Sequence, residues 1–178
     1  EAFGEHREEV AQIWVTFANW SDKNERQSIR SSIFQCHECQ VVPVVNENDV
    51  VSSEEIKLME EGISENDQLA RMVAELINAD AILFLTAAGG ICEEDPSLNH
   101  NARTYAEIDP KTAATIASFP SIISSSSTGG IGAKIREAMI CVHKGMRVAI
   151  AGMGPDVITR FAMGDLVGTA IGTSVKFQ

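Results

Sequence analysis

Three short apolar runs, each ending abruptly in polar or glycine residues, limit most strongly what this chain can fold into. They are Val41–Val45, Ala81–Leu85 and Met146–Ala151. Continuous apolar runs of this length are typical of strands buried on both faces. Stretches with helical periodicity lie between them. Because strands that alternate with helices form β/α units, the sequence predicts an α/β fold with a mostly parallel sheet.

The helical stretches carry recognisable start and stop signals. Asp22 with Glu25 three residues later predicts a capping box. Gly145 predicts a helix end just before the run at Met146. The predicted helices are Asp22–Cys39, Ser64–Asn78, Pro110–Ala117, Ile131–Lys144 and Asp156–Met163, and two further strands are predicted at Val10–Phe17 and Thr169–Phe177, with an edge position open for the last one.

Length and charge exclude some classes of function. The 178 residues favour a single domain, 1–178. The net charge is −11, with only 14 Lys plus Arg. Nucleic acid and anionic membranes both require a basic surface, so neither is expected as a partner. A small anionic ligand is still compatible, because backbone amides and one or two cations suffice to bind it.

The four cysteines do not form the pattern of a disulfide-rich scaffold, which indicates a reducing compartment and a cytoplasmic protein. Cys36 and Cys39 flank a histidine and a glutamate, but a structural zinc site requires a second ligand pair that the sequence lacks. We therefore expect no metal ligands. The charged start EAFGEHREEV is unlike a signal peptide and has no initiator Met, so we expect the chain to begin partway through a longer protein.

The stretch Thr128–Lys134, TGGIGAK, is a candidate anion site. Free N–H groups and the helix dipole favour phosphate at a helix N-terminus, and glycine allows close approach. Lys134 lies one turn into the helix and can reach back to a phosphoryl oxygen. The stretch is not a Walker A motif, because Ala133 occupies the position of the required glycine. The alternative is an ordinary glycine-containing helix start with a solvated lysine.

A second candidate is the polar loop after Val45. In open parallel sheets, ligands bind beyond the carboxyl ends of the strands. Two acid–amide pairs, Asn48-Asp49 and Asn66-Asp67, flank this long loop. Such acid–amide pairs can hold an amino group and a carboxylate together. Asp67 has an alternative role as a helix cap, in the pattern Ser64-x-x-Asp67.

Several motifs follow one another in a fixed order. They are PVVNEND ending at Asp49, EIK at 55–57, NDQL at 66–69, LFLT ending at Thr86, Asp95-Pro96 and TGGIGAK ending at Lys134. This order, over nearly the whole chain, resembles that of the glutamate 5-kinases, in the amino acid kinase superfamily.

The resemblance implies a three-layer α/β/α sandwich. It implies transfer of the γ-phosphoryl group of ATP to the side-chain carboxylate of L-glutamate, the first step of proline biosynthesis, with Mg²⁺ accompanying the nucleotide. It also implies a homo-oligomer, either dimer or tetramer.

The resemblance also implies roles for individual residues. Asp49 and Asn66 would bind glutamate, and Asp67 would orient catalytic lysines. Lys134 would counter charge on the transferring phosphoryl group, as phosphoryl transfer requires. The residues expected to bind ATP are Thr86, Ala87, Thr128, Gly129, Gly130, Ile131, Gly132, Ala133 and Lys134.

The chain departs from the family pattern at several points. An N-terminal strand with its lysine and glycine loop, a serine–glycine segment and the C-terminal RNA-binding-like domain of some members are not in this sequence. Ala87-Ala88 follow Thr86, with Ala87 in place of the usual aspartate. Residues 58–64 are extra, and Glu65 replaces an aspartate. The alternative hypothesis is therefore a truncated or degenerate kinase-fold protein that binds nucleotide or acts as a structural subunit without catalysis.

Overall fold

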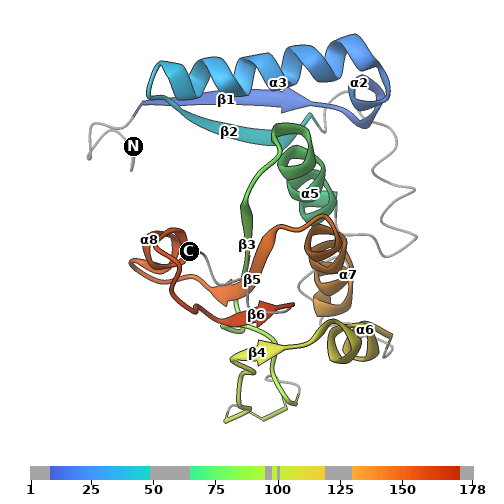
Figure 1. Ribbon diagram of the computed structural model, residues 1–178, viewed down its shortest axis with the longest axis vertical. Coiled ribbons are helices and arrows are strands. Elements are labelled where there is room, and N and C mark those ends of the chain that lie inside the picture. Colours follow the sequence, from blue (N-terminus) through green and yellow to red (C-terminus); the bar gives the residue numbers. More distant parts are fainter. Residues whose placement is uncertain (1–8, 49–64, 95–97, 100, 119–129, 173–178) are drawn as a thin grey trace. The chain divides into compact units, whose positions relative to one another are not determined.

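The computed structural model describes residues 9–48, 65–94, 98–99, 101–118 and 130–172, and divides the chain into two compact units, residues 1–61 and 62–178. Each unit is an α/β assembly with its own sheet (Figure 1). The predicted fold class, with mostly parallel strands, is confirmed. No helix in the described ranges is both long and apolar enough to span a bilayer.

The first unit is a two-stranded parallel sheet covered by a helix. Strands β1 (Val10–Val15) and β2 (Val42–Glu47) pair from Val10 opposite Val42 to Val15 opposite Glu47. Helices α2 (Phe17–Ser21) and α3 (Lys23–Glu38) connect them. Helix α3 packs on both strands and buries Ile33.

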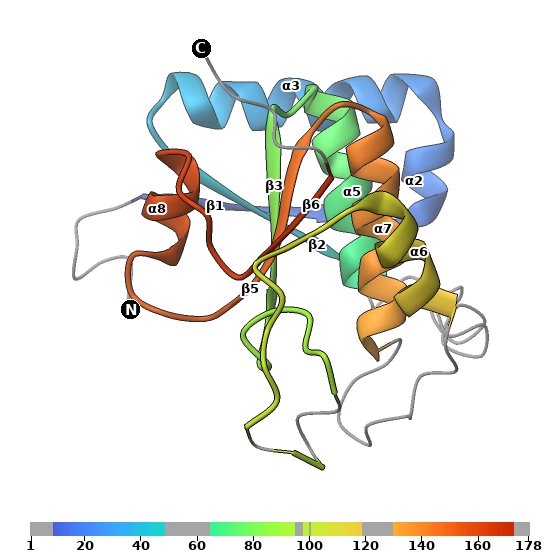
Figure 2. The ribbon, with the colours of Figure 1, turned by 60° about the horizontal axis from the view of Figure 1, so that its bottom comes forward.

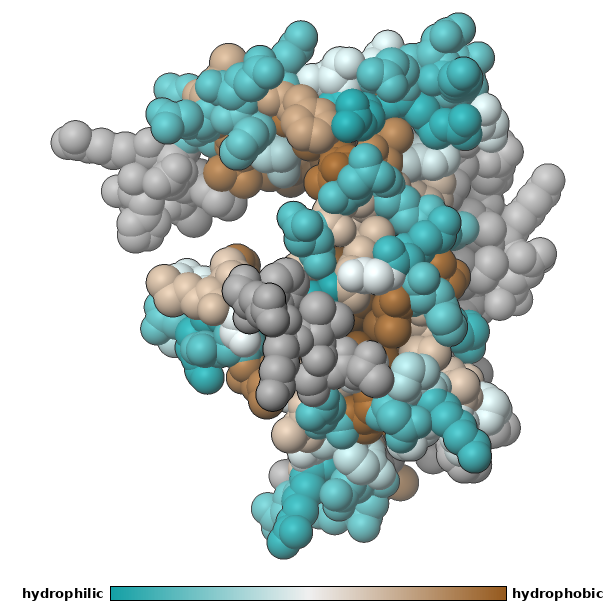
Figure 3. Space-filling view, in the orientation of Figure 1, coloured by the Kyte–Doolittle hydropathy of each residue, from teal (hydrophilic) through white to brown (hydrophobic). Residues whose placement is uncertain are grey.

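The opposite face of this small sheet is mostly apolar and exposed, with Gln12 as an exposed polar residue on it. Side chains alternate along strands, so one face carries Val10, Trp14, Val42 and Val44, all of which are exposed. In the space-filling view, α3 is largely hydrophilic, whereas hydrophobic side chains appear along the two strands (Figure 3).

The second unit contains a four-stranded sheet with the order β3-β5-β6-β4. Strand β3 (Ala81–Thr86) pairs in parallel with β5 (Arg147–Gly152), and β4 (Glu107–Ile108) pairs in parallel with β6 (Thr169–Ile171). Strand β6 runs antiparallel to β5 and lies between β5 and β4, so the last strand is internal in its sheet and not at an edge.

Helices cover both faces of this sheet, which gives three layers within the second unit. Helices α5 (Glu65–Ile77), α6 (Pro110–Ser118) and α7 (Gly130–His143) pack on one face, and α8 (Val157–Ala162) packs on the other. Figure 2 shows α5, α7 and α6 side by side, with α8 across the strands from them.

The alternation of side chains along β5 explains the two faces. Val148 and Ile150 point into the larger core with Ile135 of α7, whereas Ala149 and Ala151 point towards Phe161 of α8. Because β5 is apolar on both sides, it can be buried only between two helical layers.

Most predicted elements are present, with changes at their ends. The capping box predicted at Asp22 is half right: Asp22 Oδ1 accepts from the backbone N–H of Glu25, but the Glu25 carboxylate accepts from the Asn19 amide. Two elements were missed, α2 and β4. Helix α2 is only one turn long, and its capping box at Thr16 lies inside the strand predicted at Val10–Phe17.

Candidate functional site

Two helix N-termini and two strand ends meet at one edge of the second unit. Helix α5 leads through a short turn into β3, and α7 leads in the same way into β5. Each helix packs on the sheet. Because only a short turn separates each helix from the next strand, the helix runs opposite to that strand. The first turns of α5 and α7 therefore lie at the edge where β3 and β5 end, which is where α/β proteins bind ligands.

An ion pair joins these two helix starts. Lys134 Nζ, in the second turn of α7, lies 2.5 Å from Asp67 Oδ1 in the first turn of α5. The Lys134 and Asp67 side chains are only 17% and 11% exposed. Lys134 Nζ also lies 5.6 Å from the centre of the Phe84 ring in β3. The structure thus brings together the two residues predicted to be catalytic, although their roles stay predictions.

Arg71 forms a second ion pair between the same helices one turn further along, and it also pairs with Glu75 within α5. Arg71 Nε donates to Glu137 Oε2 at 2.5 Å, and Arg71 Nη1 donates to Glu75 Oε1 at 2.8 Å. Burial alone would lower the pKa of Arg71, but its hydrogen bonds to Glu137 and Glu75 outweigh this and raise the pKa above its ordinary value. Arg71 therefore remains positively charged.

The start of α7 has features that suit an anion. Gly132 and Ala133 in the first turn carry at most a methyl group, and that turn has no acidic side chain that would repel an anion. The first N–H groups of a helix have no partner within the helix. Together with Lys134 they form a donor set that suits the phosphates of a nucleotide.

The ends of β3 and β5 approach each other closely. Their register places Thr86 opposite Gly152. A Cβ added to Gly152 would lie 2.8 Å from the Cα of Gly89, so glycine is required here for the turn after β3 to pack. Thr86 is half-buried, and Ala87 is exposed in the turn that follows.

The other predicted site residues are placed less completely. Asn66 is exposed in the first turn of α5, and Ile131 is partly exposed at the start of α7. Asp49, Thr128 and Gly129 lie outside the described residues. The described ranges contain no group of three or more His, Cys, Asp or Glu side chains that could hold a metal ion.

Sequence reasoning missed Arg71, Glu75 and Glu137. A signal for them was present: Asp67, Arg71 and Glu75 alternate in charge at intervals of four residues, the spacing at which helix side chains meet. The pairing across to Glu137 could not be read from spacing, because it depends on how two separate helices pack.

The fold and this edge of the sheet define an α/β protein with a candidate anion site at two helix N-termini. Residues 1–152 match the Amino acid kinase family, and the chain belongs to that family.

Among curated relatives, the chain is 37% identical over 174 residues to the glutamate 5-kinase of Bordetella petrii, covering 96% of this chain and 44% of the relative. It is 35% identical over 170 residues to the glutamate 5-kinase of Burkholderia lata, covering 95% of this chain and 44% of the relative. The chain thus spans less than half the length of these relatives.

Solved structures support the fold. The isopentenyl phosphate kinase substrate complex matches with a TM-score of 0.60 at 18% identity, over 96% of this chain and 63% of that one. Aspartokinase III of E. coli matches with a TM-score of 0.54 at 14% identity, over 93% of this chain and 36% of that one. At these identities the likeness concerns the fold alone.

Proposed function

We propose that this chain is part of a glutamate 5-kinase that phosphorylates the side-chain carboxylate of L-glutamate. The observation that carries the proposal is the Lys134–Asp67 pair at the adjoining N-termini of α5 and α7. The kinship with glutamate 5-kinases at 35–37% identity supports the choice of substrate.

In this proposal the start of α7 holds the phosphates of ATP. Its N–H groups and dipole attract the anion, and Lys134 compensates charge that builds up on the γ-phosphoryl oxygens. Asp67 holds the Lys134 ammonium in place before the nucleotide arrives. Phosphoryl transfer depends mainly on such positioning and charge stabilisation.

The proposed step is one displacement at phosphorus. A carboxylate oxygen of glutamate attacks the γ-phosphorus of ATP, and the bond to the β–γ bridging oxygen breaks. ADP leaves with that electron pair, and the product is an acyl phosphate. Asn66 and Asp49 are the residues proposed to bind glutamate.

Mg²⁺ is proposed to arrive with the nucleotide. Mg²⁺ is commonly held by substrate phosphates and one or two carboxylates, so it does not require a cluster of protein ligands. When bound, it would neutralise phosphate charge. We further propose that the protein is cytoplasmic, forms a homo-oligomer and acts in proline biosynthesis, as the sequence resemblance implies.

The test is trapping of the acyl phosphate. The full open reading frame that encodes residues 1–178 is incubated with ATP, Mg²⁺, hydroxylamine and an acceptor. Glutamate should yield a hydroxamate, whereas aspartate and glutamine should yield at most about a hundredth as much, since a site that pairs polar groups discriminates strongly. Equal rates with aspartate, or no hydroxamate from a folded protein that binds ATP, would contradict the proposal.

The second candidate is a non-catalytic protein of the same fold. Exposed Ala87 favours it, because a methyl group stands beside β3 where a carboxylate is expected from the family pattern. Calorimetric titration with ATP, run beside the hydroxamate assay, separates the non-catalytic protein from the kinase. Under this second candidate, an Ala87→Asp change would raise ATP affinity but no hydroxamate would form with either version.

A further inference from the structure

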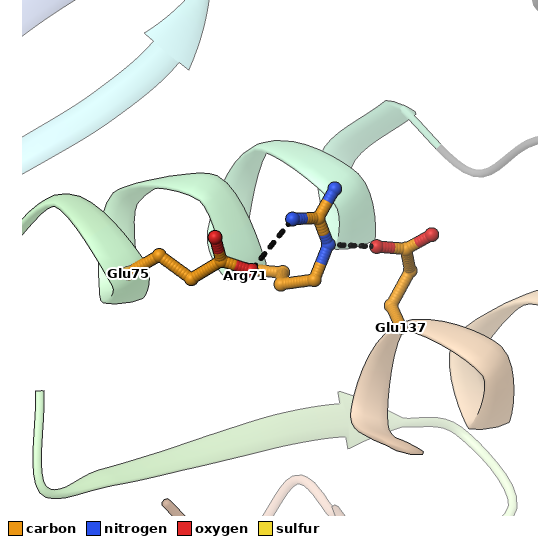
Figure 4. Close-up of polar contacts among 3 residues, drawn as sticks. All are labelled: Arg71, Glu75 and Glu137. Carbon is orange, nitrogen blue, oxygen red and sulfur yellow. Dashed lines mark hydrogen bonds and ion pairs between the residues drawn. The ribbon is translucent and has the colours of Figure 1, made fainter. Parts of the chain in front are cut away.

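Two ion pairs join α5 to α7 on successive turns, and the helix that supplies the acid in one pair supplies the base in the other. In α5 the acid Asp67 comes one turn before the base Arg71, whereas in α7 the base Lys134 comes one turn before the acid Glu137. The pairs Asp67–Lys134 and Arg71–Glu137 therefore lie on successive turns of two helices that run in the same direction. Figure 4 shows Arg71 reaching across from α5 to Glu137 of α7, with Glu75 on its other side.

Glu137 contacts one cation, and a second cation lies at helix-neighbour spacing on its own helix. Arg71 Nε lies 2.5 Å from its carboxylate. Lys134 is three residues before it on the same helix, and side chains at that spacing are neighbours. Because the Glu137 side chain is only 14% exposed, its charge cannot be satisfied by water alone. Without Arg71, the nearest cation available along α7 would be Lys134.

A lysine could not replace Arg71 in this role. The planar guanidinium contacts Glu137 through Nε and Glu75 through Nη1 at the same time. An ammonium is a single point charge without this fixed fork. The shape of arginine, together with its charge, thus ties Glu137 to α5.

We propose that Arg71 is a positioning residue. By holding the Glu137 carboxylate, it prevents Glu137 from pairing with Lys134. Lys134 then stays paired with Asp67, in the position from which it can contact a phosphoryl group. This inference rests on the proposed function for the identity of the ligand. The competition between Asp67 and Glu137 for Lys134 is independent of it.

The first experiment measures that competition through stability. The coupling between Asp67 and Lys134 is obtained from urea unfolding of Asp67→Asn, Lys134→Gln and the double variant. The same double-mutant cycle is repeated in an Arg71→Gln background. There the Asp67–Lys134 coupling, expressed as a ratio of unfolding equilibrium constants, should fall by about fivefold. Adding Glu137→Gln removes the competing carboxylate and should restore the ratio to within about twofold. A coupling that Arg71→Gln leaves unchanged would overturn the proposal.

The second experiment uses the hydroxamate assay on the full open reading frame. Arg71→Gln should lower kcat about tenfold, with KM for glutamate within about twofold, because the phosphoryl-binding lysine is displaced. Arg71→Gln/Glu137→Gln should recover most of the loss. Arg71→Lys should not keep the unaltered kcat, because an ammonium lacks the planar guanidinium that contacts Glu137 and Glu75 at the same time. Glu75→Gln is the matched control, since it removes one charge but keeps the Arg71–Glu137 contact, and kcat should stay within about twofold.

The outcomes distinguish this inference from the proposed function. Equal losses in Arg71→Gln and in the double variant would mean that Arg71 acts by packing alone, and would overturn the inference. If the unaltered protein forms no hydroxamate while the Asp67–Lys134 coupling still depends on Arg71, the positioning role stands and the proposed function fails.

Discussion

Lys134 Nζ lies 2.5 Å from Asp67 Oδ1, and this contact joins the first turn of α5 to the second turn of α7. Both side chains are largely shielded from water. Removing one partner leaves the other charge with fewer compensating groups, which costs more than the net worth of the pair. The contact therefore fixes the two helix starts relative to each other as well as the lysine itself.

We expect Asp67→Asn to lower the free energy of unfolding by about 2 kcal/mol, because the Lys134 ammonium loses its carboxylate. The control is Asp165→Asn, which breaks the Arg160–Asp165 pair at 3.2 Å. Those side chains are 58% and 54% exposed. An exposed pair of this kind contributes less than about 1 kcal/mol. Urea denaturation checks both, and equal losses would show that burial of the Asp67 pair contributes nothing.

The β/α alternation could be predicted from sequence because its causes are local. The apolar runs at Ala81–Leu85 and Met146–Ala151 are short, continuous and followed by glycine or polar residues, and both form strands. Only β5 is buried along most of its length, because β3 lies at the edge of its sheet. Strand β4 could not be predicted in this way. It has two residues, and it exists only because β6 lies beside it.

Gly152→Ala should lower the free energy of unfolding by about 1–3 kcal/mol, the usual cost of forcing atoms into a packed site. The added methyl would lie 2.8 Å from the Gly89 Cα, which is backbone and cannot move aside easily. Gly154→Ala is the matched control two residues later, where a Cβ meets nothing within 4 Å. If both variants unfold at the same urea concentration, the close approach of Gly89 and Gly152 is wrong.

Asp109 should contribute a pH-dependent cap to α6. Its carboxylate accepts from the Thr112 hydroxyl at 2.6 Å and from the backbone N–H groups of Thr112 and Lys111. The side-chain hydrogen bond from Thr112, then the backbone one, lowers the pKa of Asp109 below its ordinary value of 3.8. The ionised form is thus favoured by folding, so its contribution is present above pH 3.8 and is lost as pH falls through the lowered pKa.

The measurement for this cap is the urea midpoint of Asp109→Ala against the unaltered chain across pH. The difference between the two urea midpoints should be largest near neutral pH and should disappear in acid. Asp109→Asn can still cap the helix but cannot ionise, so its midpoint should lack the acid-dependent part. A gap that stays constant down to pH 2 would contradict the lowered pKa.

Cys141 should be unreactive while the chain is folded. It is fully buried, and burial raises the pKa of its thiol from 9.0 to about 11. Only the thiolate reacts with thiol reagents. In single-cysteine variants at pH 8, Cys141 should react with a disulfide reagent at least about 100-fold more slowly than exposed Cys39, since it requires local opening. Similar rates would contradict its burial.

The raised pKa of Cys141 also sets a stability window. The neutral thiol is favoured by folding, so its contribution is fully present below pH 9. It is lost as pH rises through the folded value of about 11. In Cys141→Ala this part of the alkaline loss of stability should be absent.

The candidate site was only partly predictable from sequence. Lys134 could be predicted from the local pattern TGGIGAK, whereas the local pattern at Asp67 indicates a helix cap and its catalytic role is implied only by the resemblance. The contact of Arg71 with Glu137 joins residues 66 positions apart, and it depends on the packing of α5 beside α7. The same holds for Gly152, whose need for glycine comes from Gly89 on another turn.

The most direct test of the central claim is the hydroxamate rate of Lys134→Met at saturating ATP and glutamate, measured in the full open reading frame beside Arg160→Met as the surface control. If Lys134 meets the transferring phosphoryl group, its loss should lower kcat by about 100-fold or more while the protein stays folded, and Arg160→Met should keep the unaltered rate. A folded Lys134→Met variant that forms glutamyl hydroxamate at the unaltered rate would contradict the account.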